Sequence, residues 1–393
     1  MAPLPDDHPE KWKYQEHTRA KHKVLYYYTD VWTRIVSNEH YKVRLFDCFA
    51  GRGDYASSDG VEPFSLQNIS AEADFPGSPL LMLDAVSRHD DLFSGAECYF
   101  LEPDDANRTA LRNMLDSVSN VPDNVQYYVS NKPFNKGGII DVVTDCEGWE
   151  GFGFFFIDPF GLKDLDYETV KQITNTSGFD CIITLMTKEL IRWQESEDHQ
   201  ETFETLYGTP RWQEELRNLQ PQHLETAEAE YYCSRLEEGG VEYTLAYMMT
   251  RGYTRELMYD LVLTTNADKG LEAMKESVSR CGTDYALAYA PKRADVGGPE
   301  QATITDGELM TEEKRAKSYL LSRFAGQEIE FDDLIQKVFA DPNRLYATSM
   351  KKDYRQYLRE MDNEGEINVL ERDREGDPFA DDCTINFPQL DVT

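Results

Sequence analysis

The chain has 393 residues and carries 73 Asp and Glu against 40 Lys and Arg, for a net charge of −33. Its length is sufficient for two domains, and its composition, 40% hydrophobic and 12% aromatic, excludes a disordered or fibrous chain. The longest apolar run, residues 152–157, is far too short to cross a bilayer.

Residues 1–40 are predicted to form a basic, aromatic helical arm. The helical pattern covers residues 11–36, where five basic residues stand against a single acid before Asp30. Lys21 and Lys23, with the aromatic residues 26–28, are candidates for contacting nucleic-acid phosphates. An arm that packs its aromatic side chains on a sheet and leaves its lysines solvated explains the pattern equally well.

Residues 41–289 are predicted to form one α/β domain in which apolar strands alternate with helices. The expected strands cover residues 43–49, 96–102, 125–130, 152–158 and 180–186, and the expected helices cover 78–89, 105–118, 167–175 and 269–279. This alternation predicts a parallel sheet covered on both faces. Residues 189–238 are polar and helical, as in an insertion, and residues 242–265 predict a hairpin that turns at Arg251-Gly252-Tyr253.

The C-terminal part is predicted to hold a linker (290–309), a winged-helix-like domain (310–372) and an acidic tail (373–393). Three helical patterns are followed by a strand after Gly365, which is the order of a winged helix-turn-helix. The third helix carries a basic stripe that is a candidate nucleic-acid contact, made of Lys351, Lys352, Arg355 and Arg359. A scaffold or dimerisation module with a solvated charged face is an equal alternative.

The seven cysteines, at positions 48, 98, 146, 181, 233, 281 and 383, are far apart and have no His cluster beside them. Several lie in apolar runs, so we predict buried free thiols in a reducing compartment and no metal site. We expect a soluble, cytoplasmic protein. Because the acids are spread along the whole chain, a halophile's protein is favoured over a mesophilic acidic one.

Three acids stand at the ends of predicted strands. Asp47 precedes a turn with Gly51 and Gly53, Glu102 ends the second strand, and Asp158 ends the fourth. The carboxyl ends of parallel strands form the ligand-binding edge of such a sheet, and an acid after the second strand can bind both hydroxyls of a ribose. No Walker phosphate loop occurs, so the pattern favours a positively charged nucleoside without phosphates. For the glycine turn taken alone, an ordinary tight turn is an equal alternative.

The segments FDCFAGRGDY, PGSPLLML, YFLEPD and FFFIDPFGL together resemble a class I S-adenosylmethionine (SAM) methyltransferase. Their order is similar to that of the three-Cys-motif partner protein family, TcmP, and to the bacterial ribosomal-RNA adenine-N6 methyltransferases of the J type. The resemblance covers roughly residues 11–280. It implies a Rossmann-like class I methyltransferase sheet.

The resemblance also implies roles for particular residues. Its cofactor-binding residues would be Asp47, Ala50, Gly51, Gly53, Ser78, Glu102 and Asn131, with Glu102 on the ribose and Asn131 on the adenine amine. Asp158 and the carbonyl of Pro159 would accept hydrogen bonds from an exocyclic amine. Phe160 occupies the place of the second Pro in the family's D-P-P-Y loop, and Gly161 that of its aromatic residue.

The predicted function is SAM-dependent methyl transfer to a base amine of DNA or RNA, in a system that includes a three-Cys-motif partner protein. A catalytically silent methyltransferase fold that binds nucleic acid or such a partner is the alternative, motivated by the irregular DPFG loop. A nuclease that holds Mg²⁺ on the strand-end acids is a third reading. The charge of −33 opposes nucleic-acid binding in dilute buffer, and molar salt screens both the repulsion and the phosphate attraction.

Overall fold

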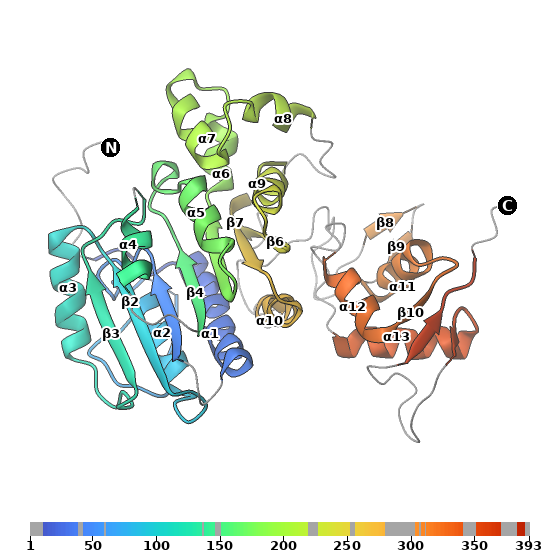
Figure 1. The fold of residues 1–393 in the computed structure, drawn as a ribbon, viewed down its shortest axis with the longest axis horizontal. Coiled ribbons are helices and arrows are strands. Elements are labelled where there is room, and N and C mark those ends of the chain that lie inside the picture. Colours follow the sequence, from blue (N-terminus) through green and yellow to red (C-terminus); the bar gives the residue numbers. More distant parts are fainter. Residues whose placement is uncertain are drawn as a thin grey trace. The chain divides into compact units, whose positions relative to one another are not determined.

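The computed structural model describes residues 11–37, 42–58, 60–135, 137–145, 151–218, 227–251, 256–279, 303–305, 308–310, 312–340, 351–370 and 383–389. The chain divides into two compact units, residues 1–288 and residues 289–393 (Figure 1). No helix in these described ranges is both long enough and apolar enough to cross a membrane.

A seven-stranded sheet forms the centre of the first unit, in the order β3-β2-β1-β4-β5-β7-β6. Its strands are β1 (Lys42–Asp47), β2 (Gly95–Leu101), β3 (Val125–Ser130), β4 (Gly151–Ile157), β5 (Phe179–Leu185), β6 (Tyr243–Arg251) and β7 (Glu256–Thr265). The first five are parallel, and β7 runs antiparallel between β5 and β6. This is the strand order of the class I methyltransferase sheet, and the predicted Rossmann-like α/β fold is confirmed.

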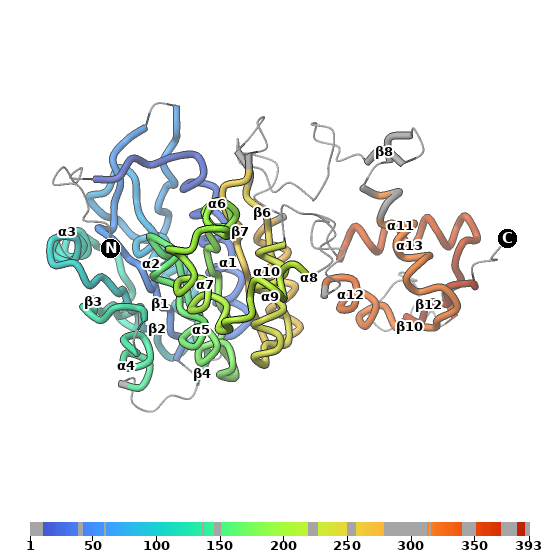
Figure 2. Tube along the Cα trace, turned by 90° about the horizontal axis from the view of Figure 1, so that it is seen from above, coloured from blue at the N-terminus to red at the C-terminus, as the bar shows by residue number. Residues whose placement is uncertain are grey.

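Helices cover both faces of this sheet (Figure 2). They are α1 (Glu16–Val36), α2 (Ser78–Ser87), α3 (Asp105–Asp116), α4 (Gly138–Asp145), α5 (Tyr167–Thr174), α9 (Ala227–Glu238) and α10 (Asp268–Ser279). Phe154 of β4 contacts Tyr28 and Trp32 of α1, which packs beside α2 and α10. The next residue, Phe155, points to the opposite face, where α4, α5 and α9 share one hydrophobic core with the sheet.

Most predicted elements agree with the structure to within two residues at each end. Helix α4 was not predicted, and α1 begins at Glu16, five residues later than the helical pattern. The predicted insertion is helical, with α6 (Thr187–Trp193), α7 (Gln200–Tyr207) and α8 (Trp212–Asn218) ahead of α9. Stacked rings of Phe203, Tyr207 and Trp212 pack this insertion together.

The described residues of the second unit form three helices and a small antiparallel sheet, β10-β12-β11. Its elements are α11 (Glu312–Arg323), β10 (Glu328–Glu330), α12 (Phe331–Ala340), α13 (Lys351–Glu364), β11 (Asn368–Val369) and β12 (Thr384–Asn386). Strand β12 lies in the segment expected to be an acidic tail, and it pairs with both β10 and β11. Strands β8 (Thr303–Thr305) and β9 (Glu308–Met310) pair within or next to the expected linker. The winged-helix assignment stays a prediction.

Five cysteines lie in the described part of the chain, and all are buried: Cys48, Cys98, Cys181, Cys233 and Cys383. The prediction of buried thiols is confirmed for these five. Cys146 and Cys281 lie outside the described residues.

Candidate functional site

The three strand-end acids lie side by side at the carboxyl edge of the sheet. Strand β1 pairs in parallel with β2 on one side and β4 on the other. Asp47 is the last residue of β1, Glu102 follows β2, and Asp158 follows β4. No group of three or more His, Cys, Asp or Glu within the described ranges is arranged to hold a metal ion.

The chain leaves β1 through a turn that crosses the edge of the sheet. The N–H of Ala50 donates to the carbonyl of Leu101 at the end of β2, over 2.9 Å. Gly51 and Gly53 have φ values of +62° and +83°, which favour glycine. The N–H of Gly77, just before α2, donates to the Gly53 carbonyl over 2.9 Å, so the turn is fixed against the next helix.

The carboxylate of Asp47 is fully buried at the base of this turn. One oxygen accepts from the N–H of Phe49 at 3.2 Å, and Oδ2 has no hydrogen-bond partner among the described residues. Burial raises the pKa of Asp47 to about 7, and the charges of Asp158 and Glu102 add to this effect. The nearby Ser78 hydroxyl and the Phe49 N–H oppose it.

The carboxylate of Glu102 is also buried and also has one oxygen without a hydrogen-bond partner among the described residues. Its Oε1 accepts from the N–H of Asp104 at 2.8 Å, while Oε2 is buried and has no partner in the described part of the chain. Burial raises the pKa of Glu102 to about 7, and the N–H groups of Asp104 and Gly51 act in the other direction. Two buried carboxylates with one unpartnered oxygen each are costly without a ligand, and they suit a ligand that donates hydrogen bonds or carries positive charge.

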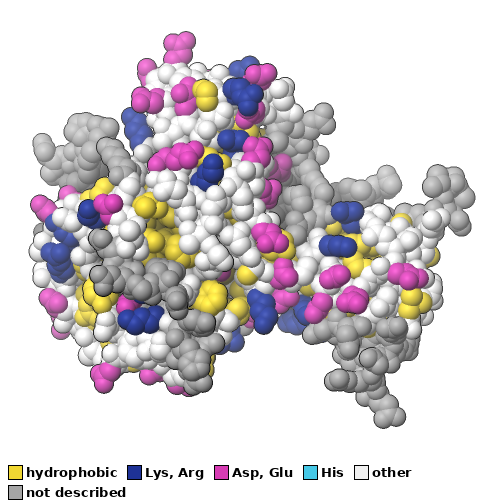
Figure 3. All heavy atoms as spheres, in the orientation of Figure 1, with side chains coloured by type: hydrophobic (Ala, Val, Ile, Leu, Met, Phe, Trp, Pro, Cys, Tyr) yellow, Lys and Arg dark blue, Asp and Glu magenta, His cyan; other side chains and the backbone are white. Residues whose placement is uncertain are grey.

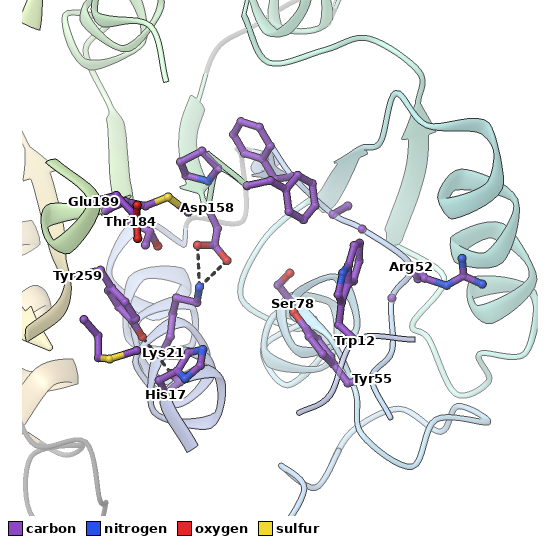
Figure 4. Close-up of a pocket in the computed structure, with 18 of the residues that line it drawn as sticks. Trp12, His17, Lys21, Arg52, Tyr55, Ser78, Asp158, Thr184, Glu189 and Tyr259 are labelled. Atoms are coloured by element: carbon purple, nitrogen blue, oxygen red, sulfur yellow. Dashed lines mark hydrogen bonds and ion pairs between the residues drawn. The ribbon is translucent and has the colours of Figure 1, made fainter. Parts of the chain in front are cut away.

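A cavity of about 420 Å³ opens beside the glycine turn. Its lining places Trp12, Arg52, Tyr55 and Ser78 on one side, and His17, Lys21, Asp158, Thr184, Glu189 and Tyr259 on the other (Figure 4). Asp47 and Glu102 lie behind this lining, next to Phe49, Ser78 and Gly51, which belong to it. The turn and the Asp158 loop therefore face one shared space.

A short N-terminal strap borders the cavity. The N–H of Tyr14 donates to the carbonyl of Ala56, and the N–H of Ala56 donates to the carbonyl of Trp12, each over 2.8 Å. Lys11 forms an ion pair with Asp54. This pairing makes residues 11–15 extended rather than helical, which corrects the prediction of a helix from residue 11.

Asp158 is paired with a lysine from α1. The ammonium of Lys21 lies 2.7 and 2.6 Å from its two carboxylate oxygens and 5.3 Å from the ring centre of Tyr259 (Figure 4). Tyr259 in turn donates to the carbonyl of His17 at 3.0 Å. Burial lowers the pKa of His22 to about 3, with Lys21 adding to the effect, so His22 is neutral at neutral pH.

The residues after Asp158 supply an aromatic surface at the cavity. The side chain of Phe160 is 56% exposed. Its ring centre lies 5.4 Å from that of Trp12 and 6.1 Å from that of Phe49. Gly161 offers no side chain, so the aromatic rings in this part of the lining are those of Phe160, Trp12 and Phe49.

Comparisons with known proteins add little to this geometry. No family model matches the chain, and no curated protein matches it. A solved structure to which it is similar is a putative O-methyltransferase from Klebsiella pneumoniae, with 10% sequence identity and a TM-score of 0.31. The match covers 64% of this chain and 88% of the other. Neither the TcmP resemblance nor the relation to the J-type enzymes receives support from these comparisons.

Two predicted residues lie away from the cavity. Asn131 is exposed and lines a different cavity beside β3, not the one at the glycine turn. Lys23 is only 7% exposed, with its ammonium 5.6 Å from the ring centre of Tyr27. This burial leaves Lys23 poorly placed to contact a nucleic-acid phosphate.

The basic stripe of α13 belongs to the second unit. Lys351 donates to Asp332 at 2.6 Å, and both Lys351 and Arg355 lie over the ring of Phe331. Lys352 and Arg359 are exposed. The role of this stripe in nucleic-acid binding stays a prediction.

Sequence reasoning missed several residues of the cavity lining, among them Trp12, Thr184 and Tyr259. Thr184 is near the end of β5 and Tyr259 is in β7, so both come from strands that were predicted correctly. The available signal was their place in the sheet, since β5 and β7 are neighbours in the class I strand order. Trp12 had no such signal, because its pairing with Ala56 is not local.

Proposed function

We propose that this protein is a SAM-dependent methyltransferase that acts on an amine of a nucleic-acid base. The observation that carries the proposal is the pair of buried carboxylates, Asp47 and Glu102, each with an unpartnered oxygen beside a turn of two positive-φ glycines. SAM carries matching donors, an ammonium and two ribose hydroxyls, and when bound its sulfonium supplies an electrophilic methyl group.

On the cofactor side, Glu102 accepts hydrogen bonds from the ribose hydroxyls through Oε2. Asp47 would lie toward the cationic methionine part, whose positive charge would offset the burial of the carboxylate. Gly51 and Gly53 let the backbone pass close to the ligand because they have no side chain. These residues bind and orient the cofactor.

On the acceptor side, Asp158 and the carbonyl of Pro159 accept hydrogen bonds from the target amine. An exocyclic amine is a poor nucleophile because its lone pair is delocalised into the ring. Two acceptors favour its tetrahedral form and align the lone pair, so catalysis is mainly orientation and electrostatics. The rings of Phe160 and Trp12 offer aromatic contacts to a base that has left the stack.

The first test is calorimetric titration of SAM into the purified protein in molar KCl. We expect binding by the wild type, loss of binding in Glu102→Gln, and retained binding in Asp158→Asn. The protein is then incubated with methyl-deuterated SAM and with total DNA or RNA, and the nucleosides are analysed by mass spectrometry. Label on a base amine that Asp158→Asn abolishes supports the proposal, and label that survives this change contradicts the role of Asp158.

One observation favours a second candidate function, a catalytically silent protein that binds nucleic acid or a partner. Lys21 donates hydrogen bonds to both oxygens of Asp158, the carboxylate that must accept a hydrogen bond from the target amine. SAM binding without transfer to DNA or RNA by the folded protein would favour this candidate. Both candidate functions include a three-Cys-motif partner protein. Co-purification of such a protein with the full chain tests this partnership.

A further inference from the structure

A row of stacked rings crosses four neighbouring strands of the sheet. Phe155, Phe46, Tyr99 and Tyr128 are partners in register on β4, β1, β2 and β3. Successive ring centres lie 4.4, 5.1 and 5.0 Å apart, with interplanar angles of 6°, 13° and 22°. The rings therefore lie nearly parallel and point to the same face of the sheet.

The row ends at the edge of the sheet with an open ring face. Strand β3 is the edge strand of the described sheet, and Tyr128 is 43% exposed. The hydroxyl of Tyr128 donates to Gln126 Oε1 at 2.6 Å. This hydrogen bond lies within β3 and restrains the orientation of the ring. One side of Tyr128 stacks on Tyr99, and no further described strand covers the other side. A planar ligand can continue the stack there.

A cavity of about 530 Å³ adjoins this exposed ring. It is lined by Tyr99, Arg108, Arg112, Tyr128, Val129, Ser130, Asn131 and Val142. This size is in the range of small-molecule sites. The lining contains two arginines and no acid, in a chain with 73 acidic and 40 basic residues. It shares no residue with the lining of the cavity at the glycine turn.

The two arginines lie one turn apart on α3, and they differ in their surroundings. Arg108 is fixed by hydrogen bonds to the carbonyls of Glu102 and Pro103, at 3.0 and 2.9 Å, and by an ion pair with Asp105. Arg112 is exposed and forms no ion pair with any described residue. Figure 3 shows basic, acidic and hydrophobic side chains close together over α3 and β3, at the left of the molecule. Arg112 is thus available to an anion.

We propose that this cavity at the sheet edge binds a nucleotide, with the base stacked on Tyr128 and the phosphate at Arg112 and Arg108. The stacking surface and the guanidinium groups match the two parts of a nucleotide, the planar base and the anion. Ser130 and Asn131 offer hydrogen-bonding groups between these two parts. The nucleotide is either free or a unit of a single-stranded nucleic acid, since the chemistry is the same. This site is separate from the proposed methyl transfer and does not depend on it.

The test uses the full-length protein and two probes, adenosine monophosphate and a fluorescently labelled short oligoadenylate. Affinities are measured by calorimetry and by fluorescence anisotropy, at low and at high salt. We expect Tyr128→Leu and Arg112→Ala each to weaken binding by about tenfold, as the loss of one stacking or phosphate contact does. Tyr128→Phe keeps the ring and should bind like the wild type.

Arg217→Ala is the matched control, because Arg217 is an exposed helical arginine outside this cavity. Thermal unfolding verifies that each variant is folded. Weakened binding of the monophosphate assigns the site to a free nucleotide, and weakened binding of the oligomer alone assigns it to a nucleic-acid strand. The proposal is overturned if the folded wild type binds neither probe, or if both cavity variants bind like Arg217→Ala. It is also overturned if Tyr128→Leu abolishes SAM binding, because the cavity would then belong to the cofactor site.

Discussion

The ammonium of Lys21 lies 2.7 and 2.6 Å from the two carboxylate oxygens of Asp158, although 137 residues separate them in sequence. The side chains are only 11% and 21% exposed, so solvent screens this ion pair weakly. In the proposed mechanism the same carboxylate accepts a hydrogen bond from the target amine. The substrate amine must therefore displace Lys21 from Asp158 or share the carboxylate with it.

The first prediction concerns the stability of this ion pair. Lys21→Met leaves the Asp158 carboxylate without its counter-charge and close to Asp47. We expect the free energy of unfolding to fall by about 1–3 kcal/mol, between the values for exposed and buried pairs. The double variant Lys21→Met/Asp158→Asn should recover much of this loss, which a double-mutant cycle in denaturant measures.

The matched control for that cycle is the pair formed by Lys132 and Asp141. These side chains are 47% and 58% exposed and 2.9 Å apart. Because solvent screens this pair, Lys132→Met should change stability far less than Lys21→Met. Equal effects of the two substitutions would show that Lys21 and Asp158 contribute no more than a surface pair.

The second prediction concerns pH. Burial raises the pKa of Asp47 from 3.8 to about 7, so the folded chain keeps this proton more tightly than the unfolded chain. The contribution of Asp47 to the free energy of unfolding is therefore full below about pH 4 and is lost as the pH rises to about 7. Asp47→Asn cannot ionise. We expect it to gain about 4 kcal/mol relative to the wild type between about pH 4 and pH 8, without cofactor.

Thermal unfolding of the wild type and Asp47→Asn across this pH range measures the effect. Glu102 has a pKa raised to about 7 as well, and its charge acts on Asp47, so the pH dependence of the difference reports the two carboxyl groups together. A difference in stability that stays constant from acid to neutral pH would contradict a raised pKa of Asp47 in the folded protein. The same substitution should abolish SAM binding while it raises stability, so a loss of binding cannot be attributed to unfolding.

The sequence was sufficient to place the three acids at one edge of the sheet. Asp47, Glu102 and Asp158 each follow a short apolar run, and the carboxyl ends of parallel strands meet at the same edge. Orientation beyond the strand end was less predictable. Asn131 also follows a strand, yet it lines the cavity beside β3. Strand order decides which side chains are neighbours, but the turn after each strand decides where they point.

Contacts between distant segments could not be predicted from pattern. The lysines and aromatics of residues 11–15 continue the helical composition of α1. Yet the N–H of Tyr14 donates to the carbonyl of Ala56, which lies after the glycine turn, and the N–H of Ala56 donates to the carbonyl of Trp12. Propensity is a weak constraint when a segment can pair elsewhere. The contact between Lys21 and Asp158 depends in the same way on how α1 packs against the sheet.

The third prediction concerns the glycine turn. A Cβ on Gly53, where φ is +83°, would lie 2.9 Å from Cδ1 of Leu111, which is fully buried and has little room to move. Gly53→Ala should therefore combine a backbone cost of about 1–2 kcal/mol with a packing cost of about 1–3 kcal/mol. Gly60→Ala is the control, because φ there is +77° and nothing lies within 4 Å of the added Cβ. Denaturant unfolding of both variants isolates the packing term, and equal losses would contradict it.

The last prediction concerns Trp12, whose ring lies against Phe160 and within 3.3 Å of the Cβ position of Gly51. The strap thus places an apolar ring over the turn that we assign to the cofactor. Trp12→Ala removes this cover, and we expect SAM binding to weaken by about tenfold, with a smaller effect for Trp12→Phe. Lys13→Ala is the control, since Lys13 is exposed on the same strap and its backbone pairing remains. If Trp12→Ala instead strengthens binding in calorimetry, the ring blocks the cofactor in the free protein, and the strap must move before the ligand enters.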